Sequence, residues 1–169
     1  MSILEIITYP DKLLRKISKP VVNIDGSLKQ LIENMTETMY RAPGVGLAAI
    51  QVGIDKALLV YDIAPLEGKR CVQVLINPRI MEGEGEFLSE NEGCLSVPDF
   101  KADVKRFARV LVEGLDAEGN PRRFEADGYH ALVLQHEIDH INGTLFIDHI
   151  SVLKRELYKR QVRKKLKKA

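Results

Sequence analysis

Hydrophobic residues recur every three to four positions in two stretches near the start of the chain, which is the spacing of one helix face. We therefore predict helices over residues 10–18 and 27–41. The apolar side of the second helix consists of Leu28, Leu31, Ile32, Met35 and Met39.

The middle of the chain carries short apolar runs, which are typical of β-strands. They cover residues 57–63, 71–81, 108–115 and 122–126, and the sequence DAEGN at 116–120 predicts a turn between the last two. These strands follow one another before the next long helix. This order favours an α+β fold, with mostly antiparallel or mixed sheets around a central helix, over alternating βαβ units.

The central helix is expected between Asp127 and Asn142-Gly143. Asp127 is a preferred N-cap residue, whose carboxylate would accept from the N–H groups of the first turn. Gly143 tolerates the left-handed conformation that ends many helices. The residues at offsets of three and four are Leu132, Val133, His136, Glu137 and His140. They share one face, which is apolar at its start and able to bind a metal at its end.

The composition is that of an ordinary globular domain, with 169 residues of which 45% are hydrophobic. The N-terminus lacks the basic, apolar and small-residue order of a signal peptide, so we expect a cytoplasmic protein. Two cysteines in that compartment are not expected to form a structural disulfide.

Residues 154–169 differ from the rest in charge. They hold nine Lys or Arg and one Glu, whereas the remaining residues carry seven more acidic than basic side chains. We expect a basic helix from about Ser151. Its apolar residues, Leu153, Leu157, Val162 and Leu166, predict a thin stripe against the body. The late lysines would stay in solvent: Lys164, Lys165, Lys167 and Lys168.

The segment LQHEIDHINGT, residues 134–144, places His136 and His140 one helical turn apart. Residues four apart are separated by about 6 Å along a helix and about 40° around it, which suits two ligands of one tetrahedral ion. Glu137 would lie at the edge of this face, where it could reach a water on the metal without being a ligand. The identity of a third ligand decides the chemistry.

Several residues are candidates for that ligand. One class of zinc proteases has a third His shortly after this Gly, but Phe146 stands at that position here. Another class uses a Glu on a following helix. Glu156 is the nearest candidate, and an ion pair with Lys159 or Arg160 is the simpler interpretation.

The remaining candidates are histidines and cysteines. His130 and His149 are isolated, and isolated histidines are more often packed or surface residues. Cys71 lies in an apolar run and is interpreted as a small buried hydrophobe. Cys94 follows Gly93 in ENEGCLSVP, where the flanking residues suit a loop or strand end. A thiolate with two imidazoles is an established three-ligand set, yet from the residues alone a structural thiol at Cys94 is an equal alternative.

Three motifs of this chain resemble those of the peptide deformylase family, metallohydrolases that remove the formyl group from the initiator methionine of new bacterial polypeptides. They are GVGLAAIQ at 44–51, EGCLS at 92–96 and QHEIDH at 135–140, in matching order and spacing. The N-terminal YPDKLLR is also similar to the family pattern, so the resemblance spans nearly the whole chain. An HExxH motif alone is moderately specific, whereas the three together are very specific.

The resemblance implies a role for each matching residue. The metal ligands would be Cys94, His136 and His140, and Glu137 the catalytic acid/base. Gln51, through its side-chain amide, and Leu95, through its backbone N–H, would stabilise the oxyanion together with the metal. The residues along the substrate, bound as an extended strand, would be Val45, Gly46, Glu92 and Gly93. Lys101 replaces a frequent Arg, and Pro43 a frequent acidic residue, which leaves the preference for peptide side chains open.

The family also implies the cofactor and partners. One divalent ion is expected, Fe²⁺ in the cell, with Zn²⁺, Ni²⁺ or Co²⁺ as substitutes that fit the same ligands. A water activated by the ion would attack the formyl carbon of N-formylmethionyl nascent peptides, with Glu137 as general base and then acid, and would release formate. The basic tail would contact the ribosome through ribosomal RNA. We expect neither membrane association nor DNA binding.

Two other functions stay in view. An RNA-binding or ribosomal protein could hold a structural zinc, but such sites usually have four protein ligands and no fourth is evident. A peptidase would use the same Glu and metal but needs room for a residue on the acyl side. We therefore expect a metallohydrolase catalytic domain over residues 1–153, with residues 154–169 as a basic helical tail of the same domain.

Overall fold

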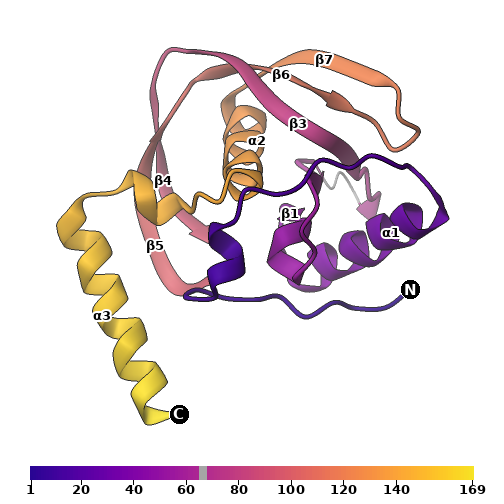
Figure 1. The fold of residues 1–169 in the computed structure, drawn as a ribbon. Coiled ribbons are helices and arrows are strands. Elements are labelled where there is room, and N and C mark those ends of the chain that lie inside the picture. Colours follow the sequence, from indigo (N-terminus) through magenta and orange to yellow (C-terminus); the bar gives the residue numbers. More distant parts are fainter. Residues whose placement is uncertain (65–67) are drawn as a thin grey trace.

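The computed structural model describes residues 1–64 and 68–169. Its α-helices are α1 (Gly26–Arg41), α2 (Gly128–Ile141) and α3 (Val152–Lys168). One antiparallel sheet has the order β1-β2-β3-β6-β7, formed by Gly46–Ala48, Leu58–Tyr61, Gln73–Glu84, Arg109–Leu115 and Pro121–Asp127. The second sheet pairs β4 (Phe87–Cys94) with β5 (Val97–Arg106). Helix α2 lies between the sheets (Figure 1), so the predicted α+β class with a central helix is confirmed.

The five-stranded sheet is covered by a helix on each face at its β1–β2 end. Successive side chains of a strand point to opposite faces. Leu59 of β2 therefore joins the core around α2, whereas Leu58 joins the core against α1. The apolar side predicted for residues 27–41 is confirmed, with Leu28, Ile32, Met35 and Met39 buried.

Helix α2 begins and ends where its sequence predicts, but one capping contact is absent. Asp127 occupies the N-cap position, yet its side chain makes no capping hydrogen bond, so that detail of the prediction is wrong. At the other end Gly143 has a φ of 72°. A Cβ there would lie 2.8 Å from the carbonyl carbon of Arg15, so both conformation and space require glycine.

The predicted helix over residues 10–18 is wrong. Only Lys12–Arg15 form a short 3-10 helix, η1, which the Asp11 side chain caps through the Leu13 N–H. The chain is extended again at Lys16, and the Ser18 N–H donates to the Ile141 carbonyl at the end of α2. This tertiary hydrogen bond takes the place of a further helical turn.

Strands β4 and β5 were not predicted from the sequence. In β5 the inward positions are Ala102, Val104 and Arg106, with exposed polar residues between them. An arginine at an inward position and the mixed polarity of both strands hide the alternation that identifies a half-buried strand.

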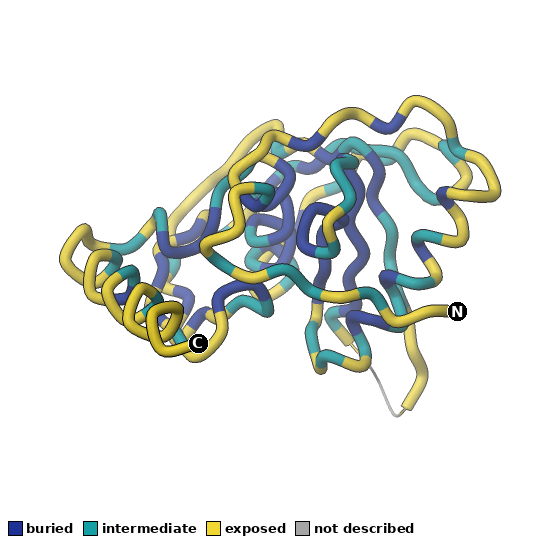
Figure 2. The backbone as a smooth tube through the Cα atoms, turned by 60° about the horizontal axis from the view of Figure 1, so that its bottom comes forward, coloured by how far each residue is buried: buried dark blue, intermediate teal, exposed yellow. Residues whose placement is uncertain are grey.

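Helix α3 projects from the body (Figure 1) and is largely exposed (Figure 2). Its predicted apolar stripe is wrong for Leu153, Leu157 and Leu166, which are 72%, 49% and 57% exposed, whereas Val162 is half-buried and packs on the core around Tyr158. Tyr158 is buried instead and packs on Phe100, with ring centroids 4.6 Å apart. The larger aromatic surface decides which side of the helix faces the body. The four late lysines are exposed, as expected.

Among the described residues, no helix combines the length and the apolar character needed to cross a membrane.

Candidate metal centre and active site

Three side chains with metal-binding atoms meet at the centre of the fold. Cys94 ends β4, while His136 and His140 lie on α2, and their ligand atoms are all within 4.8 Å of one another. Cys94 Sγ lies 3.3 Å from His140 Nε2. Sulfur and nitrogen ligands of one tetrahedral ion lie about 3.3–3.6 Å apart. The donor set and its spacing therefore fit a single divalent ion.

The thiol of Cys94 is held by a tight turn and by a buried amide. The turn pairs Cys94 with Val97, and the Ser96 N–H points at Cys94 Sγ at 3.4 Å. Gln51 is 1% exposed, and its Oε1 accepts from the Ala48 N–H. This contact leaves Gln51 Nε2 to donate to Ser96 Oγ at 3.1 Å and to lie 3.7 Å from Cys94 Sγ. The amide donor of Gln51 thus faces the ligand cluster.

Glu92 is buried against the Nδ1 side of the His136 ring. Its carboxylate accepts from His136 Nδ1–H at 2.8 Å and from the guanidinium of Arg106. Burial acts to raise the pKa of Glu92, but the hydrogen bonds and positive charges of His136 and Arg106 outweigh it and lower the pKa to about 2. Glu92 is therefore a carboxylate that orients a histidine ring and leaves its Nε2 free for a metal. Because His136 and Arg106 engage the side chain of Glu92, only its backbone remains for the expected substrate contact.

Glu137 is buried beside the ligand cluster. Within the described part of the chain, its Oε2 is buried without a hydrogen-bond partner. Burial raises its pKa to about 7. The backbone of Gly46 lies against this side chain, because a Cβ added at Gly46 would be 2.7 Å from Glu137 Cδ. A carboxyl group with this pKa can both take and give a proton near neutral pH.

One cavity of about 810 Å³ opens onto these groups. The expected site residues that line it are Val45, Gly46, Gln51, Glu92, Gly93, Cys94, Leu95, His136 and Glu137. His140 lies beneath them and is 1% exposed. Lys101, Tyr129 and Leu132 also line the cavity. The fold thus brings together three sequence segments that lie far apart in the chain.

The other candidate ligands have other partners. Glu156 pairs with Lys159 at 3.1 Å, as its spacing predicts. His149 pairs with Asp139, and His130 stacks on Phe124. Cys71 is exposed, so its interpretation as a buried hydrophobe is wrong.

The sequence did not indicate roles for Arg106, Asp139 and Ser96. Arg106 is 5% exposed, at the end of a strand that the apolar pattern does not reveal. Asp139 precedes His140 in the chain, and its partners Arg106 and His149 lie outside α2, so the local sequence does not indicate its role. The signal that could have indicated Arg106 is its position two residues after Val104 and four after Ala102, on the inward face of β5. A charged residue on an inward face needs a buried partner.

Comparisons with known proteins agree with this geometry. A family model described as polypeptide deformylase matches residues 3–156. A peptide deformylase from Desulfosudis oleivorans is 53% identical over 169 residues, which is 100% of this chain and 98% of that protein. One from Thermodesulfovibrio yellowstonii is 53% identical and covers 98% of this chain and 99% of its own length.

Solved structures give the same result. The crystal structure of a peptide deformylase from Legionella pneumophila has a TM-score of 0.89 and 45% identity, covering 98% of this chain and 96% of that one. A structure from Ehrlichia chaffeensis in complex with actinonin has a TM-score of 0.90 and 40% identity, covering 98% of both chains.

Proposed function

The chain belongs to the polypeptide deformylase family, and on this premise we propose that it removes the N-formyl group from the initiator methionine of newly synthesised polypeptides by metal-dependent hydrolysis. The observation that carries the proposal is the cavity of about 810 Å³ that Cys94, His136 and Glu137 share, with residues 44–46 along its wall. The reaction releases formate and a free α-amino group.

We propose Cys94, His136 and His140 as the ligands of one divalent ion, Fe²⁺ in the cell, with Zn²⁺, Ni²⁺ or Co²⁺ able to substitute. Such an ion would lower the pKa of a bound water molecule towards about 7 and so supply a nucleophile at neutral pH. Burial lowers the pKa of His140 well below its ordinary value, which favours the neutral ring that a metal ligand requires.

Glu137 is proposed to move the proton. Its carboxylate takes a proton from the attacking water and then delivers it to the leaving amine nitrogen. Because its pKa is about 7 and its Oε2 has no partner within the described residues, the group is free for both steps. Removal of water from its surroundings strengthens its interaction with the developing charges.

Gln51 and Leu95 are proposed to stabilise the charge that develops on the formyl oxygen. The Nε2 of Gln51 already faces the cluster, fixed by the bond from Ala48 N–H to its Oε1. Leu95 follows Cys94 in the turn and lines the same cavity, and its backbone N–H is the second proposed donor. Donors fixed in advance stabilise a developing oxyanion without reorganisation. Gly46 and Gly93 would let the peptide backbone approach closely as an extended strand.

Three peptide substrates test this function: a formyl-Met peptide, the same peptide without the formyl group, and one that is longer on the acyl side. We expect formate and a new amino terminus from the first peptide only. Cleavage of an internal bond in the third would favour a peptidase. Metal binding without any turnover would favour a structural zinc site.

The metal assignment is tested by replacing each of the two cysteines with serine. Cys94→Ser should lose the ion, whereas Cys71→Ser should retain it, because Cys71 is exposed and lies outside the ligand cluster. The iron form should also be less active after aerobic than after anaerobic purification, since a thiolate site open to water is open to oxidation. Equal activity from both preparations would count against iron.

We further propose that residues 154–169 bring the enzyme to the ribosome as part of the same domain as residues 1–153. This segment holds nine Lys or Arg, and its late lysines are exposed. Lysines on one exposed helix suit contact with RNA phosphates, which weakens as salt rises.

A further inference from the structure

The proposed metal ligands come from two units that share no strand pairing. Cys94 belongs to the two-stranded β4–β5 sheet, whereas His136 and His140 belong to α2, which packs on the five-stranded sheet. In the described part of the chain, no ladder of backbone hydrogen bonds joins the two sheets. The distance between the sulfur and the two imidazoles therefore depends on side chains that join these units.

Arg106 is one such side chain. It ends β5, is 5% exposed and forms hydrogen bonds with two carboxylates. Its Nε donates to Glu92 Oε2 at 3.2 Å, and its Nη1 donates to Asp139 Oδ2 at 2.7 Å. Glu92 lies on β4 and Asp139 on α2, so one planar guanidinium joins three elements. The same Asp139 oxygen accepts from His149 Nε2 at 2.8 Å.

Gln135 of α2 forms a second link, to Phe107, which is the residue after Arg106. Its side-chain Oε1 accepts from the Phe107 N–H at 2.9 Å, and its Nε2 donates to the Phe107 carbonyl at 3.0 Å. The amide is 5% exposed and pairs with the backbone as a neighbouring strand would. Residues 106 and 107 are thus both fastened to α2, one through its side chain and one through its backbone.

These links adjoin the ligands directly. Gln135 precedes His136, Asp139 precedes His140, and Glu92 stands two residues before Cys94. Resting on the proposed function, we propose that Arg106 and Gln135 are positioning residues that dock the β4–β5 sheet on α2 and thereby set the spacing between Cys94 and the two histidines. Arg106 also fixes the Glu92 carboxylate that orients His136.

The alternative is that both residues only stabilise the fold. Buried ion pairs contribute little net stability compared with apolar residues of similar size. A positioning role requires the planar guanidinium itself. Lysine in place of Arg106 keeps the charge but cannot bond two carboxylates in one plane, so it should disturb the metal site. The two explanations therefore separate when metal geometry is measured apart from stability.

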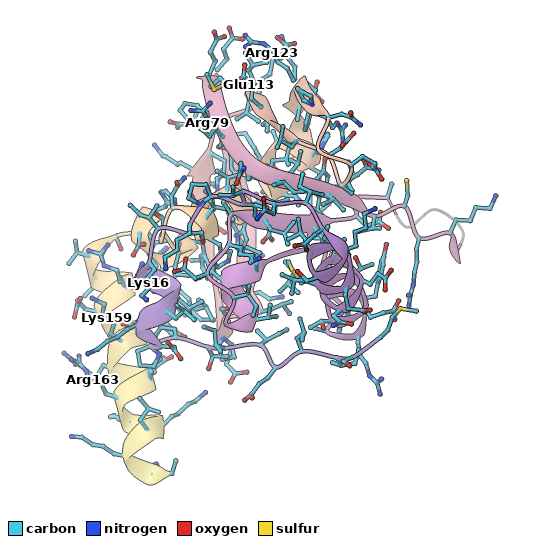
Figure 3. All side chains as sticks on the ribbon, turned by 45° about the vertical axis from the view of Figure 1, so that its right-hand side comes forward. Lys16, Arg79, Glu113, Arg123, Lys159 and Arg163 are labelled. Carbon is cyan, nitrogen blue, oxygen red and sulfur yellow. The ribbon has the colours of Figure 1, made fainter. Side chains whose placement is uncertain are left out.

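The experiment compares the Arg106→Lys and Gln135→Met variants with the unsubstituted parent protein and with Arg123→Lys. Arg123 is a matched control, because it pairs with Glu113 between β7 and β6 at the surface (Figure 3). Metal-free protein is loaded with Co²⁺. The affinity is measured by chelator competition, the sulfur-to-cobalt charge-transfer absorption reports the thiolate bond, and thermal unfolding of the metal-free form reports stability.

We expect Co²⁺ affinity to fall by about 10- to 100-fold in Arg106→Lys and Gln135→Met, with a weaker or shifted thiolate absorption, and to stay unchanged in Arg123→Lys. Folded variants with parental affinity and absorption would overturn the inference, as would an affinity loss that Arg123→Lys shares. Should Arg106→Lys fail to fold, Asp139→Asn keeps an oxygen acceptor and should show the same spectral change in a milder form. Absence of Co²⁺–thiolate absorption in the parent would instead refute the proposed metal site itself.

Discussion

The acid/base chemistry proposed for Glu137 comes from its surroundings more than from its residue type. Glu92 is also a glutamate beside His136, yet its pKa is about 2, whereas that of Glu137 is about 7. Glu92 has Arg106 and His136 as partners, and Glu137 is buried without comparable partners among the described residues. Two carboxyl groups on one site thus differ by environment alone.

Glu137→Gln separates proton transfer from metal binding. We expect the variant to retain its ion, because Glu137 lies outside the ligand cluster. Turnover should fall by about 10²- to 10⁴-fold or more, since an amide cannot accept the proton of the attacking water. Metal content and formate release are measured on the same sample. Loss of metal in step with activity would make Glu137 a ligand.

Gly46→Ala tests the close approach of the first motif to Glu137. The added methyl group would overlap the carboxylate, because the ideal Cβ lies 2.7 Å from both Cγ and Cδ of Glu137. Glu137 must shift, and a displacement of about 1 Å can reduce turnover by about 10²-fold. The thermal midpoint and metal content should change little by comparison. Parental kcat in the folded variant would show that Glu137 needs no such exact placement.

At the level of single elements, the sequence predicts best where local signals and tertiary packing agree. Helix α1 has an apolar side that the core buries, and α2 ends at a glycine that nothing larger could replace. The segment 10–18 fails because Ser18 bonds to α2. Strand β5 was not predicted, because Arg106 takes an inward position. Its charge is buried there because Glu92 on β4 and Asp139 on α2 accept its hydrogen bonds.

The start of α2 should respond to pH through His130. This side chain stacks on Phe124 and contacts the Tyr61 hydroxyl at 3.2 Å. Burial, and next the charge of Arg122, lower its pKa below 6.5. Between the lowered pKa of the folded state and about 6.5 in the unfolded chain, the unfolded chain binds more protons than the folded one. The free energy of unfolding therefore falls as the pH drops below about 6.5.

His130→Leu should remove this contribution. The difference between the urea midpoints of variant and parent should move in favour of the variant between about pH 7.5 and pH 5. Tyr61→Phe is the control, because it removes the hydroxyl contact and leaves the titrating ring in place. A difference that stays constant over this range would show that His130 titrates alike in both states.

At the scale of the whole molecule, the site could be predicted only in part from residue patterns. The HExxH spacing identifies two ligands within one helix, because they lie one helical turn apart on the same face. Cys94 is 42 residues before His136 in the chain, and only the docking of β4–β5 on α2 brings its sulfur near the imidazoles. The resemblance to a family supplied what spacing could not, and neither indicated the buried links through Arg106 and Gln135.

The charge distribution concerns the whole molecule too, and truncation tests it. Removal of residues 159–169 takes away seven Lys or Arg and leaves Tyr158, whose ring packs on Phe100. Because the cavity is lined by residues 43–137, formyl-Met peptide hydrolysis should stay within about twofold of the parent. Co-sedimentation with ribosomes at low salt should fall sharply, since phosphate contacts carry such binding. Replacing Lys164, Lys165, Lys167 and Lys168 with Gln keeps the helix length and should give a similar loss. Undiminished co-sedimentation of both variants would show that the tail does not hold the enzyme on the ribosome.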